Sequence, residues 1–178
     1  YPYFCLTCRT DSPIIITQSA ITARHKREKI MITTNQEIII NQAKNILFSE
    51  LTKNSLSLLS PEVVADYLKL QISNLEREVF GVLFLDSQNK LIEDEILFKG
   101  TINQASVYPR EVAKSSLIKN ALSVIFYHNH PSGHQEASQA DKETTKRLIK
   151  ALDLIEVRVI DHIIICKENH FSFAEKGL

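Results

Sequence analysis

The chain has 178 residues, an apolar content of 44%, and 21 acidic side chains balanced by 21 basic ones. This size and composition are typical of one globular domain with its own core, and they exclude a largely disordered chain. The balanced charge disfavours a free-standing nucleic-acid binder, because such proteins usually carry a basic excess or a basic stripe. No apolar stretch approaches the length that crosses a bilayer, so we expect a cytoplasmic protein with no membrane partner.

The first thirty residues differ from the rest of the chain. They show no sustained hydrophobic period, and a charged cluster occupies residues 24–29. The chain does not begin with Met, and its single Met is Met31. We therefore predict that residues 1–30 are an extension that is either disordered or foreign to the natural protein. Cys5 and Cys8 form one C-x-x-C pair, whereas a zinc ribbon needs two pairs, so no metal site is predicted there.

Residues 31–76 are predicted to form a helical prelude. The first helix is expected to bury a face made of Ile39, Ala43, Ile46 and Leu47. A second helix is predicted to begin at Ser60, because serine is a favoured N-cap residue and Pro61 suits the first helical position. Its apolar face is expected to hold Val64, Tyr67 and Leu68.

Residues 77–178 alternate between strand and helix patterns. Two strands are predicted at 77–86 and 91–98, joined by a hairpin turn at 87–90. A helix beginning near Pro109 is expected to bury Val112, Ala113, Ser116, Leu117 and Ala121. The later elements are expected at 122–128 (strand), 138–153 (helix, with Thr145, Leu148, Ile149 and Leu152 on one face), 157–166 and 170–174 (strands). Helices interleaved with strands predict a layered α/β domain.

A group of metal-ligating residue types follows the predicted strand at 122–128. His128 and His130 are two residues apart, so on a strand their side chains point to the same face. Ser138 and Asp141 open the next predicted helix, which brings a carboxylate back beside the strand end. Zn²⁺ binds imidazole nitrogen and carboxylate oxygen, and catalytic zinc sites use three protein ligands. The pattern predicts a zinc site made of His128, His130 and Asp141.

The same residues also allow interpretations that need no metal. A histidine at a strand end is commonly structural or exposed to solvent. Ser138 and Asp141 match a variant of the capping box, in which the two residues satisfy backbone donors at a helix start. The combination at this spacing nevertheless favours a metal site over independent caps and loop histidines.

This stretch resembles the JAMM/MPN metalloprotease domain and, within it, the bacterial RadC family. The JAMM pattern is an upstream Glu, then His-x-His-Pro, then Ser-x-x-Asp. The resemblance runs from about residue 77 to the C-terminus and also rests on the segments 82–86, 98–101, 107–112, 128–133, 161–162 and 172–175. The chain is similar to the short, single-domain RadC-like proteins, because the longer ones carry helical hairpins with glycine-rich turns and this chain has no glycine before Gly81.

The resemblance implies a fold and an activity for residues 77–178. The fold is a mixed sheet flanked by helices, in the JAMM/MPN (cytidine-deaminase-like) architecture. The activity is that of a metalloprotease-like hydrolase with one Zn²⁺ per chain, in which activated water attacks the carbonyl of a peptide or isopeptide bond in a peptide or protein substrate. Because the RadC name is tied to DNA repair, a DNA repair or recombination accessory that uses the fold as a binding scaffold is the alternative function.

The resemblance also assigns catalytic roles. Glu78 lies fifty residues before His128, at the head of an apolar strand, and is expected to act as general base and then acid. Glu111, near a predicted helix start, is the alternative base, although an acid there is favoured by the helix dipole alone. Ser138 is expected to help hold the oxyanion of the tetrahedral intermediate.

Other residues and other enzyme classes fit the pattern less well. Asp161 and His162 are explained equally well as core residues and are left outside the predicted site, and His134 is expected to be exposed. A zinc deaminase would pair His-x-Glu with Pro-Cys-x-x-Cys, which this chain lacks near its predicted site. A two-metal nuclease would need several carboxylates, and only Asp141 is suitably placed.

Overall fold

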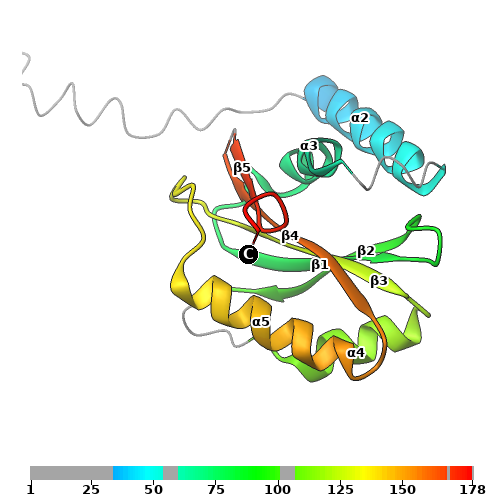
Figure 1. Ribbon diagram of the computed structural model, residues 1–178. Coiled ribbons are helices and arrows are strands. Elements are labelled where there is room, and N and C mark those ends of the chain that lie inside the picture. Colours follow the sequence, from blue (N-terminus) through cyan, green and yellow to red (C-terminus); the bar gives the residue numbers. More distant parts are fainter. Residues whose placement is uncertain (1–33, 54–59, 101–106, 168, 178) are drawn as a thin grey trace, which may run out of the picture. The chain divides into compact units, whose positions relative to one another are not determined.

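Helices cover both faces of a five-stranded sheet in the computed structural model (Figure 1). The structure describes residues 34–53, 60–100, 107–167 and 169–177. The predictions for residues 1–30, including the C-x-x-C pair, lie outside the described residues. The described elements, in chain order, are α2 (Thr34–Lys53), α3 (Pro61–Ile72), β1 (Val79–Leu85), β2 (Leu91–Lys99), α4 (Pro109–Ile118), β3 (Ser123–Asn129), α5 (Gln139–Asp153), β4 (Arg158–Cys166) and β5 (Asn169–Ser172).

The sheet is mixed, as predicted. Its strand order is β2-β1-β3-β4-β5. β1 runs antiparallel to both β2 and β3, β3 runs parallel to β4, and β4 runs antiparallel to β5. β2 lies at one edge, and the predicted hairpin joins it to β1. Asp86 Oδ1 stabilises this turn by accepting hydrogen bonds of 2.8 Å from the backbone N–H groups of Gln88 and Lys90.

The central strands carry one hydrophobic cluster on each face, because successive side chains on a strand point to opposite sides. On one face, Val79, Leu83 and Leu85 of β1 and Ile125 and Tyr127 of β3 pack with α3. On the other face, Phe80, Val82, Phe84, Val124 and Phe126 pack with α4 and α5. Figure 1 shows α3 and α5 on opposite sides of the sheet. His128 continues the row of Val124 and Phe126, so its side chain points to the α5 side.

The second predicted helix begins where the sequence indicated. Ser60 is the N-cap residue of α3, and Pro61 occupies its first helical position. The Ser60 hydroxyl donates to Glu62 Oε2 at 2.6 Å instead of capping the backbone. The predicted apolar face of Val64, Tyr67 and Leu68 is buried.

The predicted buried face of the first helix was partly wrong. Ile39 and Ile46 are each 63% exposed, whereas Leu51 is fully buried. Leu47, which was predicted correctly, packs against the same cluster as Leu51. The two leucines are four residues apart, so they define a contact stripe on a face rotated away from Ile39 and Ile46.

Two further side chains were wrongly assigned to buried helix faces. Leu117 is 57% exposed and Ile149 is 42% exposed. Each follows a buried residue, Ser116 in α4 and Leu148 in α5, by one position. One residue is a rotation of about 100° around a helix, which carries both side chains out of a narrow contact stripe. No described helix combines the length and the apolar character that a membrane span requires.

Gly81 lies in the middle of β1, directly across from Tyr127 of β3. A Cβ atom at Gly81 would overlap the Tyr127 ring. The ring is fixed in place because the Tyr127 hydroxyl donates to Asp94, which also accepts a hydrogen bond from Tyr67 at 2.8 Å. The side chain of Tyr127 therefore requires glycine at position 81.

The substitution Gly81→Ala is expected to lower the free energy of unfolding by about 1–3 kcal/mol, as overpacked cores do. Urea denaturation of the metal-free protein measures this loss. In a Tyr127→Ala background the same substitution should cost much less, because the overlapping ring is gone. An equal cost in both backgrounds would show that the ring is not the reason for glycine.

Candidate metal centre

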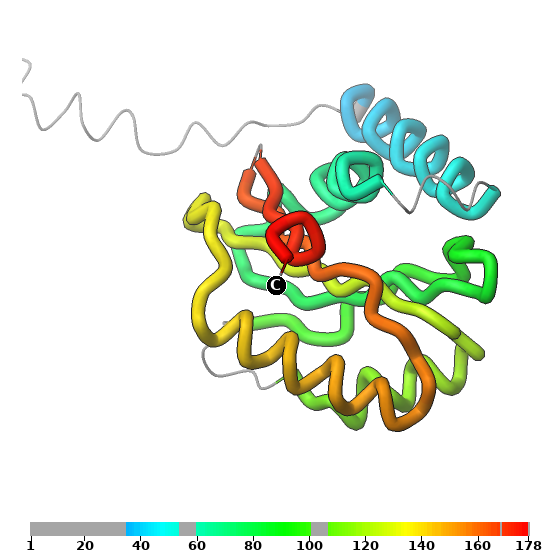
Figure 2. Tube along the Cα trace, viewed as in Figure 1, coloured from blue at the N-terminus to red at the C-terminus, as the bar shows by residue number. Residues whose placement is uncertain are grey.

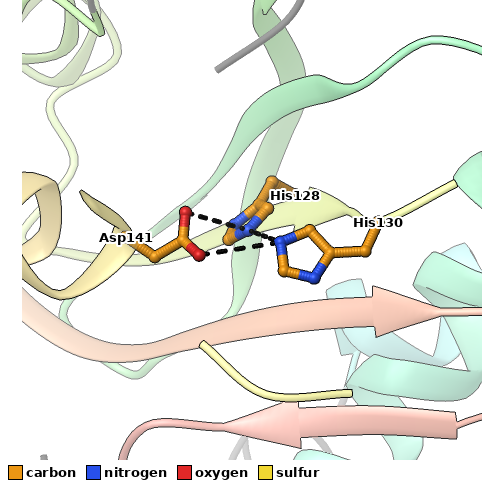
Figure 3. Close-up of side chains that lie close together, drawn as sticks. All are labelled: His128, His130 and Asp141. Carbon is orange, nitrogen blue, oxygen red and sulfur yellow. Dashed lines mark hydrogen bonds and ion pairs between the residues drawn. The ribbon is translucent and has the colours of Figure 1, made fainter. Parts of the chain in front are cut away.

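Strand β3, the loop after it and helix α5 bring the three predicted ligands together. His128 lies in β3, His130 is the first residue beyond Asn129 at the strand end, and Asp141 lies in the first turn of α5. Figure 2 shows the chain turning back from β3 into α5. All three side chains are buried, and their ligand atoms lie within 4.8 Å of one another. Figure 3 shows the side chains pointing toward one another.

The distances within this group fit the first shell of a zinc ion. His128 Nε2 is 3.0 Å from His130 Nε2. Asp141 Oδ1 is 3.4 Å from His128 Nε2, and Asp141 Oδ2 is 3.6 Å from His130 Nε2. Two atoms that are each about 2.1 Å from a tetrahedral zinc ion lie roughly 3.4 Å apart. Two imidazole nitrogens and one carboxylate are also a donor set that zinc accepts.

The surroundings of the two histidines favour one positive charge next to Asp141. The nearby Asp141 carboxylate is the main reason that the pKa of His130 is raised to about 10. Burial lowers the pKa of His128 to about 3, so this ring is neutral. Burial also raises the pKa of Asp141, but the neighbouring His130 and His128 and the hydrogen bonds from Ser138 outweigh burial and hold that pKa below its usual range. In the metal-free protein the positive charge is thus a proton on His130, which a metal ion would replace.

The orientation of His130 is fixed by the loop that follows it. His130 Nδ1 lies 2.9 Å from the backbone carbonyl oxygen of His134, to which it donates a hydrogen bond. The ring therefore turns its Nε2 toward Asp141. The side chain of His134 is exposed, as predicted, and its backbone carbonyl makes the hydrogen bond to His130.

Ser138 and Asp141 form the capping box that was one interpretation of the sequence. The Ser138 Oγ accepts from the Asp141 backbone N–H at 3.1 Å, and Asp141 Oδ2 accepts from the Ser138 backbone N–H at 2.8 Å. The Ser138 hydroxyl lies 2.6 Å from Asp141 Oδ2 and donates to it. The cap and the metal-ligand geometry therefore coexist on one aspartate. Because Asp141 uses the hydroxyl hydrogen, oxyanion binding by Ser138 stays a prediction.

The two candidate bases lie in different surroundings. Glu78 immediately precedes β1 and is half-buried, and its backbone carbonyl accepts from the Gly100 N–H at 2.9 Å. It lines a cavity of about 400 Å³ together with Glu76, Arg77, Gly100, Pro131 and Ser132. Pro131 and Ser132 come directly after His130, so this cavity adjoins the metal-ligand loop. Glu111 lies in the first turn of α4 and pairs with Arg110 at 3.0 Å.

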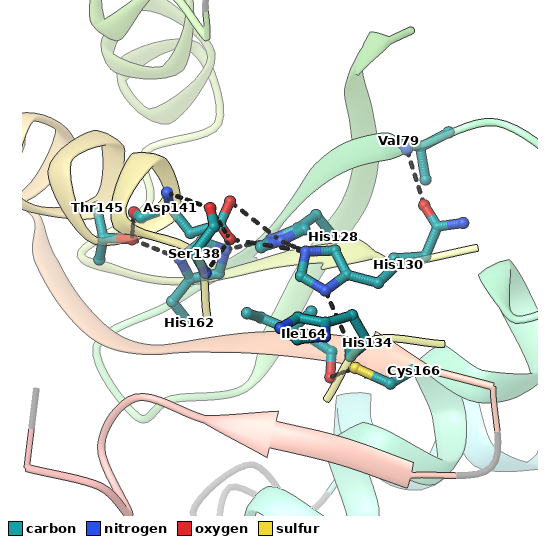
Figure 4. Close-up of polar contacts among 11 residues, drawn as sticks. Val79, His128, His130, His134, Ser138, Asp141, Thr145, His162, Ile164 and Cys166 are labelled. Atoms are coloured by element: carbon teal, nitrogen blue, oxygen red, sulfur yellow. Dashed lines mark hydrogen bonds and ion pairs between the residues drawn. The ribbon is translucent and has the colours of Figure 1, made fainter. Parts of the chain in front are cut away.

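His162 belongs to the polar group around the site, although it was not predicted to be part of that site. Its ring is buried in β4, and its Nε2 lies 2.8 Å from His128 Nδ1. Its Nδ1 lies 2.6 Å from the hydroxyl oxygen of Thr145 (Figure 4). Burial lowers the pKa of His162 well below its usual value, so the ring is neutral. A histidine directly before the apolar run Ile163–Ile165 was the available signal, but its partner depends on the pairing of β3 with β4.

Asp161, also left out, has a structural role close to the site. Its Oδ1 accepts from the backbone N–H groups of His162 at 2.7 Å and Ala174 at 2.9 Å. Its Oδ2 accepts from the Ser172 hydroxyl at 2.6 Å. These bonds hold the segment after β5 against β4, so that the Phe173 ring stacks on His162 with 4.8 Å between ring centroids.

Comparison with known proteins places this arrangement in a family. Residues 58–178 match the RadC-like JAB domain. A UPF0758 protein of Pseudoalteromonas translucida is 62% identical over 119 residues, which are 67% of this chain and 53% of that protein. UPF0758 proteins of Leptothrix cholodnii and Cellvibrio japonicus are 49% and 48% identical, over 80% and 79% of this chain and over 64% and 62% of their own lengths.

These matches bear out the resemblance to the RadC family that the motifs indicated. The chain spans between 53% and 64% of the length of these three relatives. The family match begins at residue 58 and so includes helix α3 as well as the sheet. With its mixed sheet, its flanking helices and its buried His-His-Asp group, the chain belongs to the family of RadC-like JAB domains.

Proposed function

We propose that the protein is a zinc-dependent hydrolase that cleaves an amide bond, either peptide or isopeptide, in a peptide or protein substrate. The observation that carries this proposal is the convergence of His128 Nε2, His130 Nε2 and the Asp141 carboxylate at distances that suit zinc. The group contains three protein ligands among the described residues. Three ligands are typical of catalytic zinc sites, whereas structural sites usually have four.

Zinc at such a site supplies Lewis acidity, which lowers the pKa of a water molecule to about 7 and polarises a carbonyl group. In our proposal, His128, His130 and Asp141 hold the ion, and the capping box with Ser138 keeps the Asp141 carboxylate in one rotamer. The amide substrate is inferred from the family resemblance, because the chemistry of the ligands alone would serve several hydrolytic reactions.

We assign Glu78 as the group that takes a proton from water and passes it to the leaving nitrogen. β1 and β3 are antiparallel, and Phe80 is the partner of His128. The pairing ends at Phe80, and if its register continued by two residues, Glu78 would lie across from His130 on the same face of the sheet. The cavity that Glu78 shares with Pro131 and Ser132 gives a substrate access to this edge.

The proposal is tested by metal content and by reversible loss of activity. We expect the purified protein to contain close to one zinc ion per chain by elemental mass spectrometry. Chelation should abolish hydrolysis of a mixed panel of fluorogenic peptides and lysine isopeptides, and added zinc should restore it. A protein that stays metal-free when zinc is supplied would contradict the zinc site. A zinc-loaded protein that cleaves no member of the panel but binds DNA with a steep salt dependence would favour the accessory function.

A further inference from the structure

We propose that His162 is a positioning residue, which fixes the tautomer of His128 so that the His128 Nε2 lone pair faces the metal. The inference rests on the metal site proposed above. It follows from a run of hydrogen bonds that starts at one ligand, His128, passes through His162 and Thr145, and ends at the backbone of a second ligand, Asp141.

The direction of these bonds is determined at Thr145. Its Oγ1 lies 2.7 Å from the Asp141 carbonyl oxygen and 2.6 Å from His162 Nδ1. A carbonyl oxygen can only accept, so the single hydroxyl hydrogen of Thr145 is directed to Asp141. The Thr145 oxygen must then accept a hydrogen bond from His162, which places a proton on His162 Nδ1.

The surroundings of His162 keep the ring neutral. Phe173 stacks on the ring, and Phe80 and Phe126 meet it edge-on with ring centroids 5.6 and 5.9 Å away. A charged imidazole among three aromatic rings would lose its hydration without adequate compensation. A neutral histidine that carries its proton on Nδ1 has a lone pair on Nε2, so His162 Nε2 can only accept.

His128 must therefore donate to His162. The His128 Nδ1–H points at His162 Nε2 across 2.8 Å, and the other nitrogen, His128 Nε2, is left with its lone pair. That lone pair faces His130 and Asp141, where a metal ion would lie. A ligand histidine fixed by a partner on its second nitrogen binds metal more tightly, and loss of such a partner typically lowers metal affinity about 10- to 100-fold.

Two substitutions of His162 separate its hydrogen bond to His128 from the packing of its ring. His162→Phe keeps a ring of similar shape but removes the acceptor, and we expect it to weaken zinc binding about 10- to 100-fold. His162→Gln supplies an amide oxygen near the position of Nε2, and we expect it to recover most of the affinity. Competition with a chromophoric chelator measures both, and the visible spectrum of the Co²⁺-loaded variants reports whether the ligand geometry is preserved. Urea unfolding of the metal-free variants checks that each is folded.

If His162→Phe does not fold, substitutions of Thr145 test the same run of hydrogen bonds. Thr145→Val is isosteric and removes the hydroxyl, so it should weaken zinc binding, whereas Thr145→Ser should not. A merely structural role for the threonine would make valine as good as serine for metal affinity.

The tautomers can also be read directly from the metal-free wild-type protein by ¹⁵N NMR of its histidine rings. We expect His162 and His128 each to carry the ring proton on Nδ1. A proton on His162 Nε2, or unchanged zinc affinity in folded His162→Phe, would overturn the inference. Wild-type protein that binds no zinc would instead contradict the proposed function, so the two failures are distinguishable.

Discussion

Replacing Glu78 by glutamine is expected to lower the rate of amide hydrolysis by about 100- to 10,000-fold, the usual contribution of a general acid–base group. Glutamine keeps the size of the side chain but cannot accept a proton. Because Glu78 is not one of the three metal ligands, the variant should still bind close to one zinc ion per chain. The measurement is kcat with the best substrate of the panel, together with elemental analysis of the same preparation.

Glu111→Gln is the matched comparison for this experiment. Glu111 lies in the first turn of α4 and pairs with Arg110, an arrangement that needs no catalytic role. We expect its substitution to leave kcat within a few-fold of the wild type. The opposite result, with Glu111→Gln inactive and Glu78→Gln active, would assign Glu111 as the general base.

Removal of one metal ligand is expected to be the second large effect. Zinc sites with four protein ligands bind with roughly 10–16 kcal/mol, so one ligand accounts for about 2.5–4 kcal/mol, or roughly 60- to 700-fold in affinity. We expect losses of this size for His128→Ala and for Asp141→Asn, together with loss of hydrolysis. Asparagine retains an acceptor for the Ser138 backbone, so Asp141→Asn tests the ligand while largely sparing the helix cap.

His134→Ala is the control for the ligand variants. This histidine lies in the same loop, but it accepts the hydrogen bond from His130 through its backbone carbonyl, which alanine also has. We expect its zinc content to match that of the wild type. Zinc binding that survives in both His128→Ala and Asp141→Asn would show that the metal binds elsewhere.

The grouping of His128, His130 and Asp141 could be predicted because local rules bring these residues together. The two-residue spacing of His128 and His130 fixes their common face on a strand, and the helix start at Ser138 fixes where Asp141 returns. Both rules operate within fourteen residues of chain. The mixed sheet followed from the family resemblance, and the order of the elements agreed with it.

His162 could not be assigned in the same way, because its role depends on contacts between distant segments. It lies 34 residues beyond His128 and meets it only because β4 pairs in parallel with β3 in one particular register. Ile39 and Ile46 of α2 were wrongly predicted to be buried for a related reason. Apolar residues occur on several sides of that helix, and the contacting face is selected by the partner surface, not by the helix itself.

The edge strand β2 has a consequence for how copies of this domain behave together. Among the described strands, β2 pairs with β1 alone. An unpaired strand edge is a template for sheet extension between molecules, which leads to aggregation. Three consecutive acidic residues, Glu93, Asp94 and Glu95, occupy the middle of β2, and Lys119 contacts only two of them. Two β2 edges that met would bring these like charges together, so the acidic residues disfavour pairing between the β2 strands of two molecules.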